Sequence, residues 1–172
     1  MRGYTGLSQS LPASAISDLL DGFYDECAEA IWEHDGLLNK TMGDAVMAVF
    51  NFPIRRDDHP RQAVLAARAI QDRWNVRRAA LAVPVGVGEK IGVGVGIDCG
   101  DISFGEFGRT HHDLTAIGNV VNTASRAQSA ATASEILLTQ AVYDRARSEL
   151  SESRAQEYRL KGFDAPMKLW AA

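Results

Sequence analysis

The chain has 172 residues, of which 46% are hydrophobic and 23% are charged, the composition of an ordinary soluble globular protein. Its formal net charge of -4 disfavours non-specific binding of nucleic acids. No apolar run reaches the length of a membrane span and the N-terminus has no secretory pattern, so we expect a cytoplasmic protein. The length suits one domain, 1–172, and two cysteines without metal-ligand spacing favour reduced thiols without excluding a disulfide.

Hydrophobic periodicity predicts alternating helices and strands. Residues 1–10 show no clear period, and residues 78–90 are expected to form a loop. The predicted elements are, in chain order, a helix from about Pro12 to Asp35, a hairpin of strands 37–40 and 45–50, a helix from Asp58 to about Arg77, a hairpin of strands 91–97 and 102–107, a helix beginning at Gly118-Asn119, a strand at 135–138, a helix from Thr139 to about Arg147, and strands at 158–160 and 167–170. This order predicts an α/β sandwich, with helices packed on a mixed sheet.

The predicted strand at 91–97 has an unusual pattern, because its apolar residues alternate with glycines. Gly92, Gly94 and Gly96 all fall on the same face of the strand. A strand face without side chains lets another element of the fold approach closely. We therefore expect a helix or loop to pack tightly against it.

The predicted helix after Gly118 carries two polar residues that suit anion binding. Asn119 is expected to cap its first turn, and Asn122 and Arg126 lie four residues apart on one face. The opposite face carries small apolar residues suited to a core contact: Val120, Ala124 and Ala127. Arginine offers a planar fork to phosphate oxygens and asparagine adds a neutral hydrogen-bonding group. The spacing alone favours a solvated polar face over an anion site.

The turn of the first hairpin holds a candidate metal ligand. Asp44 follows Gly43 at the hairpin tip, where a carboxylate is rigid and partly exposed, as a hard divalent cation requires. Gly-Asp is also ordinary turn chemistry. Lys40, four residues earlier, is either a surface lysine or a donor to a ring nitrogen of a ligand.

Other patterns of functional residues give no site. His111 and His112 are adjacent on a predicted loop, where two side chains seldom converge on one ion, and His34 and His59 lie beside helix boundaries. We expect none of the four to bind a metal. The glycines of residues 86–108 contain no phosphate loop, and no nucleophile elbow is present.

Residues 39–50, NKTMGDAVMAVF, resemble the signature hairpin of class III nucleotidyl cyclases, and residues 117–126, IGNVVNTASR, resemble the transition-state helix of the same family. Residues 95–100 with Gly105 are similar to its glycine-bearing hairpin, and residues 160–170 are similar to its C-terminal strands. The resemblance covers nearly the whole chain in order. It implies a ferredoxin-like βαββαβ-type core with a mostly antiparallel sheet, and conversion of ATP or GTP into a 3′,5′-cyclic nucleotide and pyrophosphate. The Gly-Gly-Asp-Glu-Phe hairpin of diguanylate cyclases is absent.

The resemblance also implies a role for each matching residue. Asp44 would hold two divalent ions, Mg²⁺ or Mn²⁺, while Lys40 and Thr115 would bind the adenine of ATP. Asn122 would orient the ribose, Arg126 would stabilise charge on the α-phosphate, and Lys161 would bind the terminal phosphates. Tyr4 and Thr5, in a stretch that matches the start of the family's domain, are further candidates for substrate binding. Lys40 favours ATP, because guanylate cyclases tend to carry Glu at that position.

The family's active site lies between two subunits arranged head to tail, so the resemblance implies a homodimer. Family members begin this domain with a strand that ends in a second metal-binding aspartate, and that strand would precede Met1. We therefore expect impaired activity from the sequence as given, with two explanations open: a start further upstream or a shortened copy. A sensor or regulatory domain upstream is compatible with this resemblance. The alternatives are a non-catalytic cyclase-like module that binds a nucleotide or a partner, and a guanylate cyclase.

Overall fold

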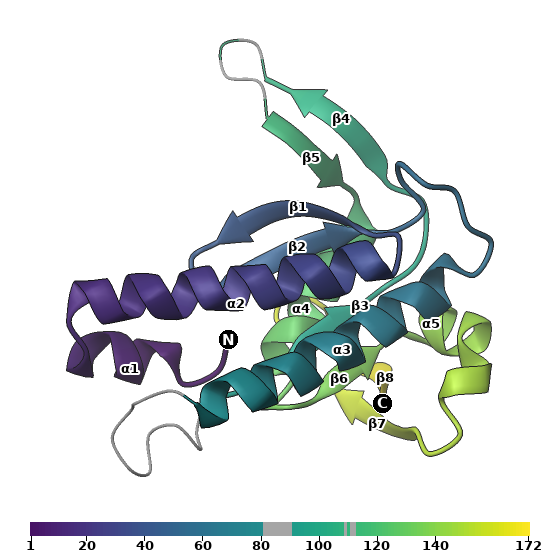
Figure 1. Ribbon diagram of the computed structural model, residues 1–172. Coiled ribbons are helices and arrows are strands. Elements are labelled where there is room, and N and C mark those ends of the chain that lie inside the picture. The colour runs from purple at the N-terminus through teal and green to yellow at the C-terminus, as the bar shows by residue number, and fades with distance from the viewer. Residues whose placement is uncertain (81–90, 109, 111–112) are drawn as a thin grey trace.

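The computed structural model describes residues 1–80, 91–108, 110 and 113–172 (Figure 1). The helices are α1 (Tyr4–Ser10), α2 (Ala13–Glu33), α3 (His59–Ala79), α4 (Asn119–Ala130) and α5 (Gln140–Arg145), followed by a 3₁₀ turn at Arg147–Glu149. The strands are β1 (Leu37–Met42), β2 (Ala45–Val49), β3 (Val95–Ile97), β4 (Ser103–Phe107), β5 (Asp113–Ile117), β6 (Ile136–Leu138), β7 (Arg154–Tyr158) and β8 (Met167–Ala171). None of the described helices is both long enough and apolar enough to cross a membrane.

The described strands form a mixed, mostly antiparallel arrangement. A four-stranded sheet has the order β3-β6-β8-β7, in which β3 and β6 are parallel and the other neighbours antiparallel. β1 pairs with β2 and β4 pairs with β5, both antiparallel. The β4–β5 pair projects away from the body of the molecule as an arm (Figure 1). The predicted α/β fold class is confirmed.

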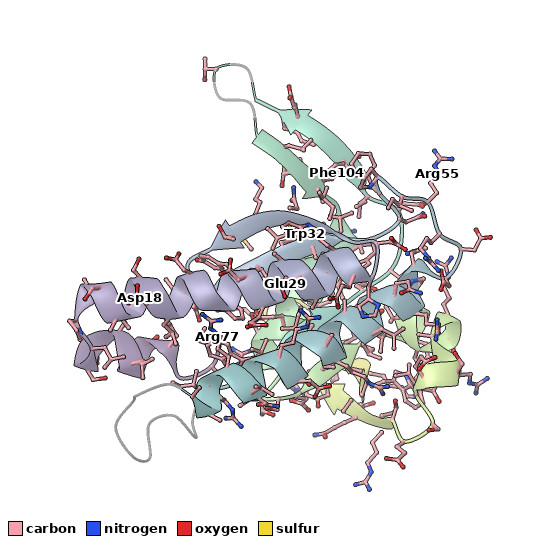
Figure 2. The ribbon with its side chains drawn as sticks, viewed as in Figure 1. Asp18, Glu29, Trp32, Arg55, Arg77 and Phe104 are labelled. Atoms are coloured by element: carbon pink, nitrogen blue, oxygen red, sulfur yellow. The ribbon has the colours of Figure 1, made fainter. Side chains whose placement is uncertain are left out.

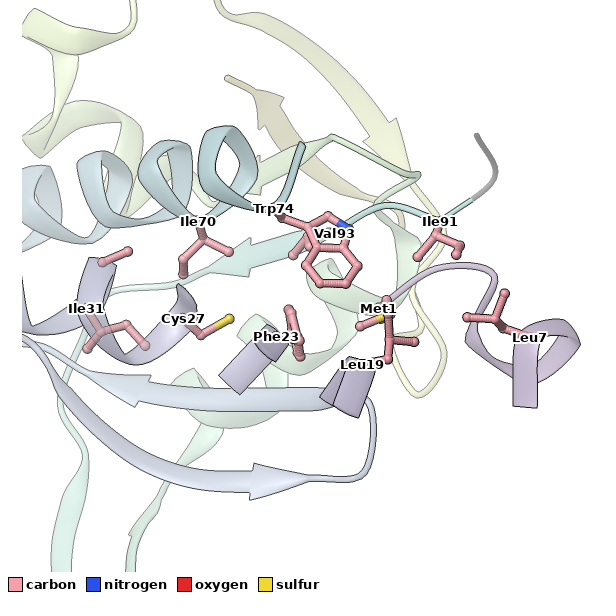
Figure 3. Packing of buried hydrophobic residues seen from close by; sticks show 11 residues of the cluster. Met1, Leu7, Leu19, Phe23, Cys27, Ile31, Ile70, Trp74, Ile91 and Val93 are labelled. Atoms are coloured by element: carbon pink, nitrogen blue, oxygen red, sulfur yellow. The ribbon is translucent and has the colours of Figure 1, made fainter. Parts of the chain in front are cut away.

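One side of the fold is covered by the long helices α2 and α3, which bury the largest apolar cluster. Phe23 of α2 meets Trp74 of α3 edge to face, with 5.5 Å between ring centroids. The same cluster extends to Met1, Ile91 and other residues that Figure 3 shows at close range. The helix that hydrophobic periodicity predicts from about Pro12 to Asp35 is therefore present as α2, and its apolar stripe lies in this cluster.

Strand β6 divides two further clusters and so defines the layers of the fold. Ile136 and Leu138 pack with residues of α3 and α5, whereas Leu137 packs with Ala127 and Ala131 of α4 and its C-terminal end. Because alternate residues of a strand point to opposite faces, α4 covers the face of the sheet opposite to α3. The sheet is thus sandwiched between helices.

Helix α4 approaches β3 as closely as the glycine pattern predicted. A Cβ atom on Gly96 would lie 2.1 Å from the backbone nitrogen of Gln128 and 2.3 Å from the carbonyl oxygen of Ala124. The neighbouring residues Val95 and Ile97 face the other way, toward the cluster of α3 and α5. Helix α4, which carries Asn122 and Arg126, therefore packs on the glycine face of β3.

Several predicted boundaries were wrong near the chain start and in the central strands. Residues 4–10 form α1, a short helix held by the fully buried Leu7, a single anchor that gives no period. Residues 91–97 were expected to form one strand, but β3 begins at Val95, and residue 92 forms only an isolated bridge with Arg2. The predicted hairpin of 91–97 with 102–107 is also wrong, because β3 pairs with β6 and β4 pairs with β5.

The C-terminal third also differs from the prediction in detail. β7 lies at 154–158 instead of 158–160, and four of its five residues are exposed, so this edge strand carries no apolar signal. The helix after Thr139 ends at Arg145, two residues earlier than predicted, and continues as a 3₁₀ turn. The loop expected at 78–90 lies mostly outside the described residues.

We expect Gly96→Ala to destabilise the fold by about 1–3 kcal/mol, because the new methyl group would push against the α4 backbone, which cannot rotate away. Urea denaturation followed by circular dichroism measures this change in the free energy of unfolding. Gly105→Ala is the matched control, since a Cβ there meets nothing within 4 Å. Equal stability of the two variants would contradict the close packing of α4 on β3.

Candidate active site

The turn between β1 and β2 holds Asp44 in a fixed place. Gly43 has a φ of 57°, a left-handed conformation that suits glycine in a tight turn. The hydroxyl group of Tyr24, on α2, donates a hydrogen bond to the Gly43 carbonyl oxygen. The Met1 nitrogen lies 2.5 Å from the Asp44 carbonyl oxygen and 3.2 Å from its Oδ2 atom. The Asp44 side chain remains 37% exposed, so its carboxylate is anchored and still accessible.

Tyr24 links this turn to the start of the chain. Burial, followed by the proximity of Tyr4, Asp21 and Asp44, raises the pKa of Tyr24. The phenol therefore stays protonated over the neutral range, as its donation to Gly43 requires. Tyr4 is half-buried against the main cluster, whereas Thr5 is exposed. Of the two candidate substrate-binding residues at the start of α1, Tyr4 is thus the one grouped with Asp44.

The proposed base-binding residues Lys40 and Thr115 come from strands of different sheets that meet side by side. The Asn39 side-chain nitrogen Nδ2 donates a hydrogen bond of 2.9 Å to the carbonyl oxygen of Leu114. Asn39 precedes Lys40 in β1, and Leu114 precedes Thr115 in β5. This bond therefore brings the two predicted residues into the same neighbourhood.

Helix α4 presents its polar face to solvent. Asn122 and Arg126 are both exposed, and neither side chain forms a hydrogen bond or ion pair with any residue that the structure describes. On the opposite face Ala127 is fully buried, and Val120 and Ala124 are half-buried. The predicted division of α4 into a packed face and a polar face is confirmed.

The beginning of α4 differs from the prediction. Gly118 occupies the N-cap position and no side chain caps the helix, so Asn119 is the first helical residue rather than the cap. The carbonyl oxygen of Asn119 accepts a hydrogen bond of 2.9 Å from the Thr123 hydroxyl group one turn later. Gly118 has a φ of 154°, outside the usual range for residues with side chains. Glycine thus serves here for backbone conformation and leaves the first amides of α4 without a side-chain cap.

Lys161 lies in an exposed turn after β7, apart from the hairpin residues. The Phe163 amide closes this turn by donating to the Leu160 carbonyl oxygen at 3.2 Å. Leu160 is buried in the same cluster as Ala127, the residue that follows Arg126 in α4. The structure therefore joins the turn of Lys161 to the second half of α4.

The described residues contain no group of three or more His, Cys, Asp or Glu side chains that could hold a metal ion. Asp44 offers its own carboxylate, a hard oxygen ligand of the kind that Mg²⁺ prefers. Of the four histidines, His34 contacts Gln62 with 3.2 Å between Nδ1 and Oε1, and His59 opens α3. His111 and His112 lie outside the described residues.

Both cysteines are free thiols. Burial raises the pKa of Cys27 to about 12, so this thiol stays protonated inside the main cluster. Cys99 is half-buried, with its sulfur 3.0 Å from a guanidinium nitrogen of Arg145. The structure contains no disulfide between them.

Sequence reasoning missed two residues that organise the site. Tyr24 lies beside the apolar stripe of α2, and only the tertiary structure reveals that its hydroxyl group reaches the hairpin turn. Asn39 falls inside the signature hairpin, but its contact depends on a register shift between Leu38 and Lys40. A polar residue in the middle of a strand predicted to be apolar was the available signal.

The matches to known proteins agree with this geometry. Residues 1–171 match the family described as adenylate and guanylate cyclase catalytic domain. An adenylate cyclase of Anabaena cylindrica is 35% identical over 127 residues, which cover 73% of this chain and 25% of that protein. The crystal structure of the adenylyl cyclase CyaB from P. aeruginosa is 29% identical and superposes with a TM-score of 0.84, covering 99% of this chain and 88% of that one. The guanylyl cyclase Cya2 shares the fold at 22% identity, with a TM-score of 0.84 and coverage of 99% and 86%.

The chain belongs to the adenylate and guanylate cyclase catalytic-domain family. Its helices and sheets are those of a nucleotidyl cyclase domain. It spans between 21% and 30% of the length of several curated relatives.

We expect Tyr24→Phe to lower the stability of the protein by about 1 kcal/mol, because the hydrogen bond to the turn of Asp44 is lost while the ring stays packed. For a chain of this length that corresponds to roughly 2–4 °C in Tm, measurable by calorimetry. Tyr143→Phe is the control, since that ring stacks on Trp170 at 3.5 Å and keeps its stacking without the hydroxyl group. An unchanged Tm for Tyr24→Phe would show that the bond does not hold the turn.

Proposed function

We propose that this domain is an adenylate cyclase, which converts ATP into 3′,5′-cyclic AMP and pyrophosphate. The observation that carries the proposal is the exposed polar face of α4, where the side chains of Asn122 and Arg126 have no partner among the described residues. Because Arg126 lies on a regular helix and its side chain is unpaired among the described residues, it is suited to stabilise phosphate charge. The adenylate cyclases among the relatives support the same activity.

In the proposed reaction the ribose 3′-oxygen forms a bond to the α-phosphorus, and the bond from that phosphorus to the oxygen bridging to the β-phosphate breaks. The electron pair leaves with pyrophosphate, and the hydroxyl proton passes to solvent. Arg126 stabilises the negative charge that grows on the α-phosphate, and Asn122 orients the ribose. Lys161 binds the terminal phosphates.

A second group of residues in the proposed site recognises the adenine base of ATP. Lys40 donates to a ring nitrogen of adenine and Thr115 accepts from its exocyclic amine. The bond between Asn39 and Leu114, which brings the two strands together, supports a shared role for these residues. The choice of ATP over GTP rests on this pair.

Asp44 is the proposed ligand for Mg²⁺ or Mn²⁺, and its accessible carboxylate fits one position in such a site. The described residues supply no group of three or more ligating His, Cys, Asp or Glu side chains, so they do not complete a site for two ions. When bound, the ions would offset phosphate charge and favour ionisation of the 3′-hydroxyl group. The Met1 backbone lies against Asp44, so a strand ending in an aspartate just before Met1 would bring that carboxylate to the same place.

The β4–β5 arm supports assembly of two copies head to tail. Its exposed apolar side chains include Phe107, Leu114 and Ile117, which are 39%, 47% and 49% exposed. Phe104 of the same arm packs against Phe52, with 4.8 Å between ring centroids, and Figure 2 shows Phe104 near the base of the projecting arm. Apolar side chains gathered on a projecting arm favour burial against a partner. Asp44 of one copy would then act with Lys40, Thr115, Asn122, Arg126 and Lys161 of the other.

The direct test measures cyclic AMP formed from ATP with Mn²⁺. It compares the chain as given with a version extended at the N-terminus by about twenty residues that include a strand ending in aspartate. That length allows for one strand, at ~3.3 Å per residue, and its flanking residues. We expect weak turnover without the extension and at least about tenfold more with it, because a second carboxylate raises affinity for the ions. Folded, dimeric extended protein that binds nucleotide without turnover would favour a non-catalytic cyclase-like module. Faster turnover of GTP than of ATP in a competition assay would identify a guanylate cyclase.

Mixing two inactive variants tests whether the site is shared between copies. Asp44→Asn and Arg126→Ala should each lower turnover of the extended protein by at least about a hundredfold when assayed alone. Both side chains are exposed or partly exposed, so the fold should remain intact. In a head-to-tail dimer, half of the mixed dimers pair the two variants and keep one intact site, so the mixture should recover about a quarter of the wild-type activity. No recovery from a mixture that exchanges subunits would contradict a shared site.

A further inference from the structure

Asn39 occupies an irregular position in β1. Leu38 pairs with Ala48 and Lys40 pairs with Met47, so the residue between them has no partner in β2. This is a β-bulge, a feature that turns a side chain out of its regular direction. At this bulge the side chain of Asn39 reaches across to the backbone of β5.

The hydrogen bond of Asn39 fixes the orientation of its amide group. The Leu114 carbonyl oxygen can only accept, so the NH₂ group must face it. The oxygen Oδ1 then points into the protein, where it is buried and has no hydrogen-bond partner in the part of the chain that the structure describes. A buried carbonyl group without a partner destabilises the fold. Stability alone therefore gives little reason for an asparagine here, since a leucine would fill similar space without that cost.

The position of this hydrogen bond suggests what the asparagine contributes instead of stability. β1 and β5 belong to separate sheets, with no backbone ladder between them among the described residues. The bond joins the residue before Lys40 to the residue before Thr115. It thus sets the spacing of two side chains that must meet the same base at once. Because both polar atoms of Asn39 are engaged or buried, it acts through these neighbours and does not touch the nucleotide.

We infer that Asn39 is a positioning residue for base selection: its hydrogen bond to Leu114 fixes Lys40 relative to Thr115 and so sets the preference for ATP over GTP. This inference rests on the proposed function, because it assigns a cause to the selectivity of that same site. Discrimination that depends on two correctly placed hydrogen bonds is lost when one partner moves, whereas the phosphate contacts, which ATP and GTP share, do not contribute to the discrimination.

The test measures the dissociation constants of non-hydrolysable ATP and GTP analogues with Mn²⁺, on the full chain and on Asn39→Leu. We expect the preference for the ATP analogue to fall by at least about tenfold in Asn39→Leu, mostly through weaker ATP binding. The Tm should stay equal or rise, because the buried unpartnered oxygen is removed together with the bond. Asn39→Asp, which has nearly the same shape but turns an acceptor toward the Leu114 carbonyl oxygen, should lose the preference as well.

Asn75→Leu, the same chemical change on α3, is the matched control and should leave the preference unchanged. If Asn39→Leu folds and still prefers the ATP analogue as strongly as the wild type, Asn39 is merely structural and the inference is wrong, while the proposed function stands. If neither the chain as given nor the extended version binds either analogue, the proposed function fails and takes the inference with it. A lowered Tm with unchanged preference would likewise overturn the positioning role.

Discussion

The close approach of α4 to the bare face of β3 is the constraint on which the rest of the site depends. Because Gly96 has no side chain, the α4 backbone at Ala124 and Gln128 rests directly on the strand. Ala127 is then fully buried, which turns the helix so that Asn122 and Arg126 face solvent. The direction of the guanidinium group is thereby set by the packing of small residues on the opposite side of the helix.

The same logic of local anchors applies at the hairpin. Tyr24 holds the turn of Asp44 from α2, and Asn39 ties the middle of β1 to β5. The turn of this hairpin and its first strand are thus held by two different elements, α2 and β5. Asp44 keeps its position relative to the start of the chain, and Lys40 keeps its position relative to Thr115.

The sequence predicted the elements that have strong local signals and missed those built by distant contacts. Local sequence signals predicted three features: the periodicity of apolar residues predicted α2, the Gly-Asp pair predicted the hairpin turn, and the alternating glycines predicted the bare face of β3. α1 depends on one buried residue, Leu7, and the edge strand β7 depends on backbone pairing with β8. The pairing of β3 with β6 joins residues about forty positions apart, which no local pattern can specify.

The candidate site followed the same division. Asp44, Asn122 and Arg126 could be picked out by their chemistry and spacing, and the resemblance to the cyclase family added Lys40, Thr115 and Lys161. The hydrogen bonds that position these residues could not be predicted from the sequence, because they depend on tertiary structure. One depends on a β-bulge at residue 39, and the other on a tyrosine hydroxyl group that reaches a turn nineteen residues away along the chain. The local sequence can therefore identify a functional residue, whereas the position of its side chain depends on the whole fold.

These anchors bear on how a shared site could assemble. The bonds that fix Asp44 and those that fix Lys40 beside Thr115 both lie within one protomer. In the proposed head-to-tail dimer each copy would therefore bring two half-sites that are already ordered, and association would only have to set them opposite each other. Side chains ordered before assembly lose little further conformational entropy when the halves meet, so more of the free energy from burying apolar surface, such as that of the β4–β5 arm, remains for binding.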